Sequence, residues 1–307
     1  VKVGQAFDLT NPFRAGTRAP RKLAAREFSL LPSARAAGAR AAAAVATGLF
    51  QGIFAQLALP VDLALDGVSL EGEVILPSAR GPARVALSGG GLAPGREGKF
   101  ELGMTAALTS TTVASLETHA TLTATMDTPR TFSRLGLQGD ATASGSQFPR
   151  GVKLSASAGA TRAAAGEDYA LMLATADKQL VDVRATFPLN APKLSGTWKI
   201  DARDADLAPF LLGRPLPPFV ATGEGQFDFD GAFAEIHARG KLHAASDNLT
   251  VVRPELAALG ALEVTAEFDL TQLGDQTRID QLRVALSGAQ PVATIHSLQS
   301  VTYNRVT

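Results

Sequence analysis

The chain has 307 residues, of which 46% are hydrophobic and only 6% aromatic, so its apolar content comes mainly from Ala, Leu and Val. Its 29 basic and 29 acidic residues give a formal net charge of zero, which argues against nucleic acid as a partner, because nucleic-acid-binding surfaces are strongly basic. The absence of Cys excludes thiol chemistry and Cys-based zinc sites. The sequence starts at Val1 without a signal peptide, and we expect it to be part of a longer protein with a targeting segment upstream.

The N-terminal part is predicted to contain strands over residues 1–32 and one long amphipathic helix over residues 33–59. Large apolar residues follow one stripe of this helix at three- and four-residue steps, namely Val45, Leu49, Phe50, Ile53, Phe54 and Leu57. Residues 41–59 carry no charge and contain Gly48-x-x-x-Gly52, a motif of membrane helices. Because the stripe is one-sided, packing on or capping a sheet is favoured; contact with a membrane surface and a membrane-spanning helix are the alternatives.

From residue 60 to residue 307 the dominant pattern is alternation of apolar and polar residues, which places successive side chains on opposite faces of a strand. In Glu263–Leu270 every second residue is apolar and the others are charged or Thr. One apolar and one polar face is typical of antiparallel sheets. We therefore predict a mostly β fold, a long, curled antiparallel sheet of about a dozen or more strands that forms an open, solenoid-like β-groove.

Glycines punctuate these runs. The glycines of three Leu-x-Gly motifs, Gly72, Gly139 and Gly196, are interpreted as strand ends, and Gly223-Glu224-Gly225 as a turn or bulge. The segment Arg84–Gly89 recurs letter for letter at Arg283–Gly288, which indicates a repeat of strand units without a fixed period.

Two segments interrupt the predicted sheet. A Pro-rich turn covers residues 207–219, because Pro lacks the N–H that a strand ladder needs, and Asp206 is expected to cap one short helical turn there. A second short helix is predicted over residues 254–259, with Pro at its start and Gly260 at its end. Residues 140–166 are rich in small residues and fit either strands or a loop.

No constellation typical of an enzyme is present, such as Gly-x-Ser-x-Gly or His-Glu-x-x-His. His237 and His243 would lie roughly 20 Å apart along an extended strand, so exposed strand histidines are favoured over a metal site. Asp201, Asp204 and Asp206 lack the glycine and terminal Glu of a calcium loop, so surface carboxylates are favoured over calcium. We predict no catalytic residues, no metal and no cofactor.

Several short motifs lie in the order expected for one known family: Leu194-Ser195-Gly196, Ala205-Asp206-Leu207-Ala208-Pro209-Phe210, Gly223-Glu224-Gly225-Gln226-Phe227, Gly240-Lys241-Leu242 and the strand from Gln281 to Gly288. Through them residues 194–299 resemble the AsmA-like and TamB-like family of bacterial envelope proteins. The segment Leu57-Ala58-Leu59-Pro60-Val61-Asp62-Leu63 is similar to an element that precedes such sheets. The resemblance implies a periplasmic β-groove, anchored to the inner membrane by a segment not present here. Such proteins carry phospholipids between membranes or support outer-membrane assembly, with outer-membrane assembly proteins as partners.

The predicted pattern also suggests a ligand on physical grounds. A sheet with one apolar face must cover that face with another layer, close on itself, or fill it with ligand, and one helix cannot cover about a dozen strands. We therefore predict that acyl chains of phospholipid lie in the curled sheet, lined by Leu63, Leu65, Phe227, Phe229, Val264, Phe268 and Leu270. The alternatives are a structural or adhesive β-solenoid with a closed core and no lipid, and an assembly factor that grips outer-membrane strands by edge pairing.

Overall fold

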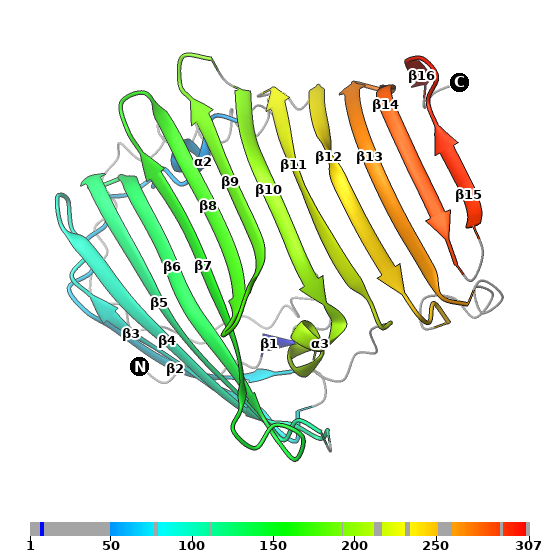
Figure 1. Ribbon diagram of the computed structural model, residues 1–307. Helices are drawn as coiled ribbons and strands as arrows, with labels where there is room; N and C mark the ends of the chain where they lie inside the picture. Colours follow the sequence, from blue (N-terminus) through cyan, green and yellow to red (C-terminus); the bar gives the residue numbers. More distant parts are fainter. Residues whose placement is uncertain are drawn as a thin grey trace.

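A computed structural model describes residues 7–8, 50–76, 79–110, 112–191, 193–211, 217–230, 234–250, 260–288 and 291–304. The strands of this part of the chain form one sixteen-stranded sheet whose order follows the sequence from β1 to β15, while β16 pairs with β14 (Figure 1). Only the β1–β2 pair is parallel, and each later pair is antiparallel. The strands are β1 (Phe7–Asp8), β2 (Val68–Ile75), β3 (Ala83–Gly90), β4 (Glu97–Ala107), β5 (Ser115–Thr128), β6 (Thr131–Ser144), β7 (Val152–Arg162), β8 (Gly166–Thr175), β9 (Gln179–Pro188), β10 (Lys193–Arg203), β11 (Val220–Asp230), β12 (Glu235–Ser246), β13 (Leu262–Leu273), β14 (Gln276–Ser287), β15 (Pro291–His296) and β16 (Val301–Asn304).

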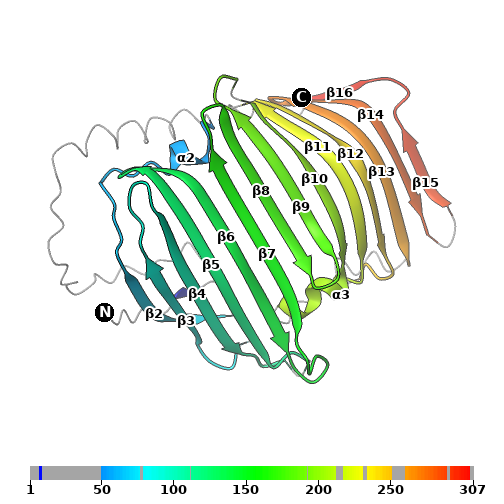
Figure 2. The ribbon, with the colours of Figure 1, turned by 60° about the vertical axis from the view of Figure 1, so that its left-hand side comes forward.

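The sheet is twisted and open, with β2 and β15 far apart in both views (Figures 1 and 2). Among the described residues, three short helical segments accompany it: α2 (Ile53–Gln56), α3 (Asp204–Leu207) and the 3₁₀ turn η1 (Ala208–Phe210). The first, α2, lies at one end of the strands, and α3 lies at the opposite end (Figure 1). The mostly β fold class predicted from the sequence is confirmed.

The contacts of η1 show that the sheet bends. Although η1 follows β10 almost directly, it contacts β6, and Phe210 packs against a cluster formed by Leu76, Ala83 and other residues of the β2–β6 region. Strands lie about 4.8 Å apart, so β10 and β6 would be roughly 19 Å apart in a flat sheet. Seven residues of helical chain advance only about 10–14 Å. The first half of the sheet therefore curls toward the face on which η1 lies.

Most strand predictions are confirmed. The segment Glu263–Leu270 lies within β13, and the repeated segment Arg84–Gly89 lies within β3. The small-residue segment 140–166, whose sequence fits either strands or a loop, forms strands: it contributes to β6 and β8 and forms all of β7. Small side chains are tolerated there because each strand has a partner on both sides.

The prediction of one long helix over residues 33–59 is wrong for the part that can be checked. Residues 33–49, including Val45 and Leu49, lie outside the described residues. Between residues 50 and 59 only Ile53–Gln56 is helical. The φ angle of Gly52 is 90°, which a right-handed helix cannot contain. After α2 the chain leaves the helix, and the Leu59 N–H donates a 2.8 Å hydrogen bond to the carbonyl oxygen of Arg130 in the β5–β6 turn.

The predictions for the glycines are also wrong. Gly72, Gly139 and Gly196 lie inside strands and do not end them, and Gly223 and Gly225 are paired residues in the middle of β11. Close neighbours on the sheet account for the missing side chains at Gly196, Gly223 and Gly225, which are described with the site below, whereas a β-carbon at Gly72 would meet nothing within 4 Å.

The interruption after β10 is confirmed with different bounds. The helical turn begins at Asp204, and the Asp206 carboxylate accepts a 2.9 Å hydrogen bond from the Arg203 N–H at its start. No strand occurs in the described parts of residues 207–219, which are 207–211 and 217–219. The predicted short helix over residues 254–259 and most of the predicted strands over residues 1–32 lie outside the described residues.

Candidate functional site

One face of the sheet is apolar from edge to edge. Side chains of residues that pair across antiparallel strands lie on the same face, so the register defines rows that cross the sheet. The first row from β2 to β15 is Leu70, Leu87, Leu102, Ala120, Gly139, Ala156, Leu173, Val181, Ile200, Gly223, Leu242, Ala266, Val284 and Ile295. The second row from β2 to β14 is Val68, Gly89, Phe100, Leu122, Leu137, Ala158, Leu171, Val183, Trp198, Gly225, Gly240, Phe268 and Leu282. We call this surface the apolar face.

At one end of the strands the apolar face is covered by the segment 50–66. Phe54 of α2 is fully buried, and the ring of Phe50 meets Phe187 edge-on at 5.0 Å between centroids. Further along this segment, Leu63 and Leu65 pack against a buried cluster of β4, β5 and their neighbours, formed by Leu92, Phe100, Ala124 and Met126. The segment 50–66 therefore seals only one margin of the face.

At the opposite end η1 supplies the cover. Pro209 is buried, and Phe210 packs against the cluster that contains Leu108, Leu116 and Ala143. Both covers lie near the strand ends, so most of the two rows lies between them. At β2–β4 the rows reach the first cover, because Val68, Leu87 and Phe100 belong to the cluster that Leu63 and Leu65 pack against.

The middle of the apolar face stays open. Five leucines of the two rows are 39–49% exposed, namely Leu70, Leu102, Leu122, Leu137 and Leu171, and Ile295 at the edge is 54% exposed. A contiguous exposed apolar surface on a folded protein marks a site of interaction with a ligand, a partner or a membrane. The exposed leucines belong to β2, β4, β5, β6 and β8, in the curled half of the sheet.

In the second half of the sheet the apolar face is aromatic. A β-carbon added at Gly223, Gly225 or Gly240 would lie 3.1, 2.7 or 2.9 Å from atoms of the Trp198 indole ring. The ring therefore lies across these three glycines on the neighbouring strands β11 and β12. In the same way a β-carbon at Gly196 would lie 2.6 Å from the ring of Phe227. The mid-strand glycines thus make room for large rings that lie against the backbone.

The predicted lining residues fall into two groups. Phe227, Phe229, Val264, Phe268 and Leu270 all lie on the apolar face of β11 and β13 and are half-buried, and the rings of Phe227 and Phe229 stack at 5.1 Å. Leu63 and Leu65 belong to the segment 50–66, which covers the same face over β4 and β5. The structure therefore brings together five of the seven residues.

A carboxylate is buried beneath the covering segment. Glu167 is 1% exposed; its Oε2 accepts a 2.6 Å hydrogen bond from the Tyr169 hydroxyl and a 3.3 Å bond from the Phe54 N–H. Its Oε1 has no partner among the described residues. The Tyr169 oxygen in turn accepts a hydrogen bond from the Ile53 N–H. Burial, reinforced by the hydrogen bond to Glu167, raises the pKa of Tyr169 above its usual range.

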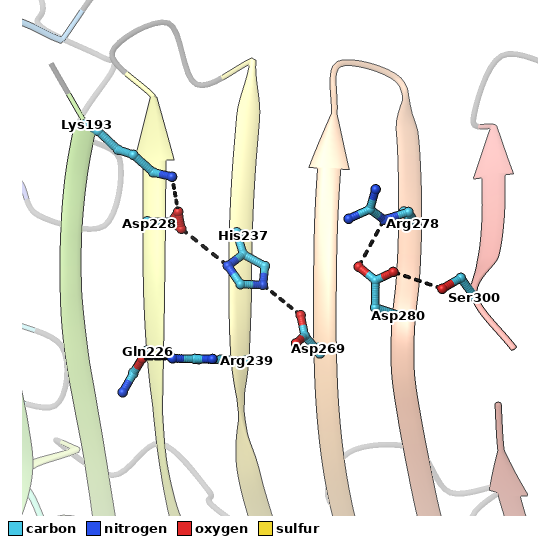
Figure 3. A network of polar contacts seen from close by, with 9 residues as sticks. All are labelled: Lys193, Gln226, Asp228, His237, Arg239, Asp269, Arg278, Asp280 and Ser300. Carbon is cyan, nitrogen blue, oxygen red and sulfur yellow. Dashed lines mark hydrogen bonds and ion pairs between the residues drawn. The ribbon is translucent and has the colours of Figure 1, made fainter. Parts of the chain in front are cut away.

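The opposite face of the sheet is polar. His237 of β12 lies between two carboxylates, with Nδ1 3.3 Å from Asp228 and Nε2 2.7 Å from Asp269, and Lys193 reaches Asp228 from β10 (Figure 3). The hydrogen bond to Asp228 raises the pKa of Lys193. Near the sheet edge, Asp280 accepts hydrogen bonds from Ser300 and Arg278, which lower its pKa (Figure 3).

A hollow of about 1170 Å³ lies on the polar face over β7 to β12. Several of its charged residues have partners on the same face: Arg184 pairs with Asp182, and the Arg239 guanidinium donates two hydrogen bonds to the neutral Gln226 side-chain oxygen. His237 belongs to this face and is half-buried. Polar side chains that pair with one another in this way are typical of a solvent-exposed face.

Two of the three carboxylates considered for calcium pair with a lysine, while the third, Asp204, accepts a hydrogen bond from the Phe219 N–H. Lys178 Nζ lies 3.0 Å from both Asp201 and Asp206. Partial burial would lower the pKa of Lys178, but the hydrogen bonds to the two carboxylates outweigh it and the pKa is raised. No group of three or more metal-binding side chains occurs in the part of the chain that the structure describes.

Sequence reasoning missed Leu171, Glu167 and Trp198 as residues of the apolar face. The alternation within β8 is enough to place Glu167 and Leu171 on this face, because they share the phase of Tyr169 and Leu173. Trp198 likewise shares the phase of Ile200 in β10, but its contact with glycines of two other strands depends on the register.

The chain matches no protein-family model, no curated protein and no solved structure. Among the described residues, helices long and apolar enough to cross a membrane are absent.

Proposed function

We propose that this protein binds acyl chains of phospholipid along its open apolar face and carries out no chemistry on them. The observation that carries the proposal is the continuity of the two apolar rows from β2 to β14, with five leucines left 39–49% exposed between the covered strand ends. Each methylene that leaves water for such a surface contributes roughly 0.8 kcal/mol, and flexible acyl chains can follow a curved row of Leu, Ala and Val.

The place of the protein in the cell is part of the same proposal. The sequence resemblance to AsmA-like and TamB-like proteins favours the bacterial periplasm, with membrane attachment through segments outside this chain and a role in moving phospholipid between membranes or in supporting outer-membrane assembly. The short covers at the two strand ends, centred on Phe54 and Phe210, leave a path across the strands rather than a closed core. This favours the groove over the alternative of a structural or adhesive solenoid without lipid.

Native mass spectrometry of gently purified protein tests the proposal. Phospholipid that co-purifies and is released on activation supports a groove. Protein that carries no lipid, and that takes up none from phosphatidylcholine vesicles, refutes it and favours the structural alternative.

A further inference from the structure

The single tryptophan of the sequence occupies a distinctive place on the apolar face. Trp198 lies in the second apolar row between Val183 of β9 and Gly225 of β11. Its ring lies across glycines of β11 and β12, as described above, so the ring is held against the sheet with one face toward the open side. It is half-buried.

The indole nitrogen is a donor without a protein acceptor. Trp198 Nε1–H makes no hydrogen bond to any described residue, and the atom is not among the side-chain atoms that are shut off from solvent. Tryptophan N–H groups find a partner when they are buried, as this one would be beneath a bound ligand, and indole rings favour positions where apolar and polar parts of a ligand or a membrane meet. An acceptor supplied by a ligand would satisfy this donor.

The two sides of Trp198 differ. Toward β11 and β12 the row continues with Gly225 and Gly240, which the ring itself covers. Toward β9, β8 and β7 it continues with Val183, the exposed Leu171 and Ala158. This aliphatic side suits a hydrocarbon chain.

We propose that Trp198 marks the ester end of a bound diacyl phospholipid, with Nε1–H donating a hydrogen bond to an ester carbonyl oxygen and one acyl chain lying across β9, β8 and β7. The inference rests on the lipid-binding function proposed above. A bilayer core about 30 Å thick holds two leaflets, so one chain is roughly 15 Å long, which spans about three strands at 4.8 Å each. The row from Trp198 to Ala158 crosses three strands beyond β10.

Trp198 fluorescence measures the proposed geometry directly, because no other tryptophan contributes. Wild-type protein is loaded with phosphatidylcholine whose chain is brominated either near the ester or near the methyl end. Bromine near the ester should quench Trp198 clearly more than bromine near the methyl end. Equal quenching by the two lipids, stronger quenching from the methyl end, or no quenching by lipid that is demonstrably bound would overturn the inference.

The hydrogen bond is tested by comparing diacyl phosphatidylcholine with its dialkyl ether analogue, which lacks the carbonyl oxygens. Wild type should bind the ester lipid about two- to tenfold more tightly, as expected for one net hydrogen bond. Trp198→Phe keeps an aromatic ring but has no donor, and should bind both lipids equally. Met172→Leu, on the polar face, should keep the ester preference.

The outcomes separate the two proposals. If lipid binds to wild type but the ester preference is absent or survives in Trp198→Phe, this inference fails and the lipid-binding function stands. If wild type binds neither lipid, the proposed function fails and the inference fails with it. The quenching arm uses only wild-type protein, so the inference stays falsifiable even if a variant does not fold.

Discussion

Two adjacent residues of β8 offer a direct test of lipid binding on the apolar face. Leu171 is 49% exposed on the apolar face between Ala158 and Val183, whereas Met172 is 39% exposed on the polar face, where it pairs with Asp182. Leu171→Arg places a charge in the row that would hold the acyl chain. Met172→Arg places the same charge on the same strand, but on the opposite face.

The expected effects on stability are small for both variants. Because each side chain already exposes a large part of its surface, and an arginine stem can lie along the sheet with its charge in water, each substitution should change the free energy of unfolding by less than about 1 kcal/mol. The effect on lipid binding should differ sharply. A charge on a lipid-facing strand position costs about 2–4 kcal/mol, so Leu171→Arg should weaken phospholipid binding about 30- to 700-fold.

The assay is equilibrium binding of a fluorescent phosphatidylcholine, with urea unfolding of the same preparations as the control for folding. Met172→Arg should bind as wild type within about twofold. The reasoning is refuted if Leu171→Arg binds normally while folded, or if Met172→Arg weakens binding to the same extent, because the effect would then not depend on the face.

Three further predictions concern stability. Phe54→Ala should lower the free energy of unfolding by about 3–5 kcal/mol in urea denaturation, because the ring is fully buried and leaves a cavity; a loss below about 1 kcal/mol would mean that α2 is not docked on the sheet. Gly225→Val should cost about 1–3 kcal/mol and shift the emission of Trp198, because the new side chain would displace the ring; an unchanged spectrum would contradict the ring position. Tyr169 and Lys178 have raised pKa values in the folded protein, so the stability they contribute is complete below the unfolded-state values of about 10 and 10.4 and is lost as pH rises through the folded values. The urea midpoint should therefore fall above about pH 10 and fall less steeply in Tyr169→Phe; a midpoint that is flat over this range would contradict the assignment.

The sequence predicts the fold class because alternation is a local property. Residues two positions apart determine that Val264, Phe268 and Leu270 lie on one face of β13. A strand with one apolar face in turn predicts a sheet that buries this face. The helix prediction is wrong because the apolar stripe around Phe54 fits helical spacing, while the chain is redirected at Gly52 and by the backbone bond from Leu59 to the β5–β6 turn.

The parts that the sequence does not predict depend on contacts between strands. The role of Gly225 is set by Trp198, a residue 27 positions earlier, and becomes evident only when the register aligns the two. Glu167 shares the phase of the apolar residues in its strand. The covering segment that buries it comes from more than 100 residues away, as the hydrogen bond from the Phe54 N–H to the Glu167 carboxylate shows. Such pairings cannot be deduced from local spacing.

The agreement between strand order and chain order has a consequence for how such a protein can change in length. Each strand from β2 to β14 pairs with its immediate predecessor and successor in the sequence. Removing or duplicating two consecutive strands would restore both the direction of the next strand and the face to which its side chains point. A lineage could therefore lengthen or shorten the apolar path by whole hairpins without redesigning the remaining strands, much as repeat proteins gain and lose modules.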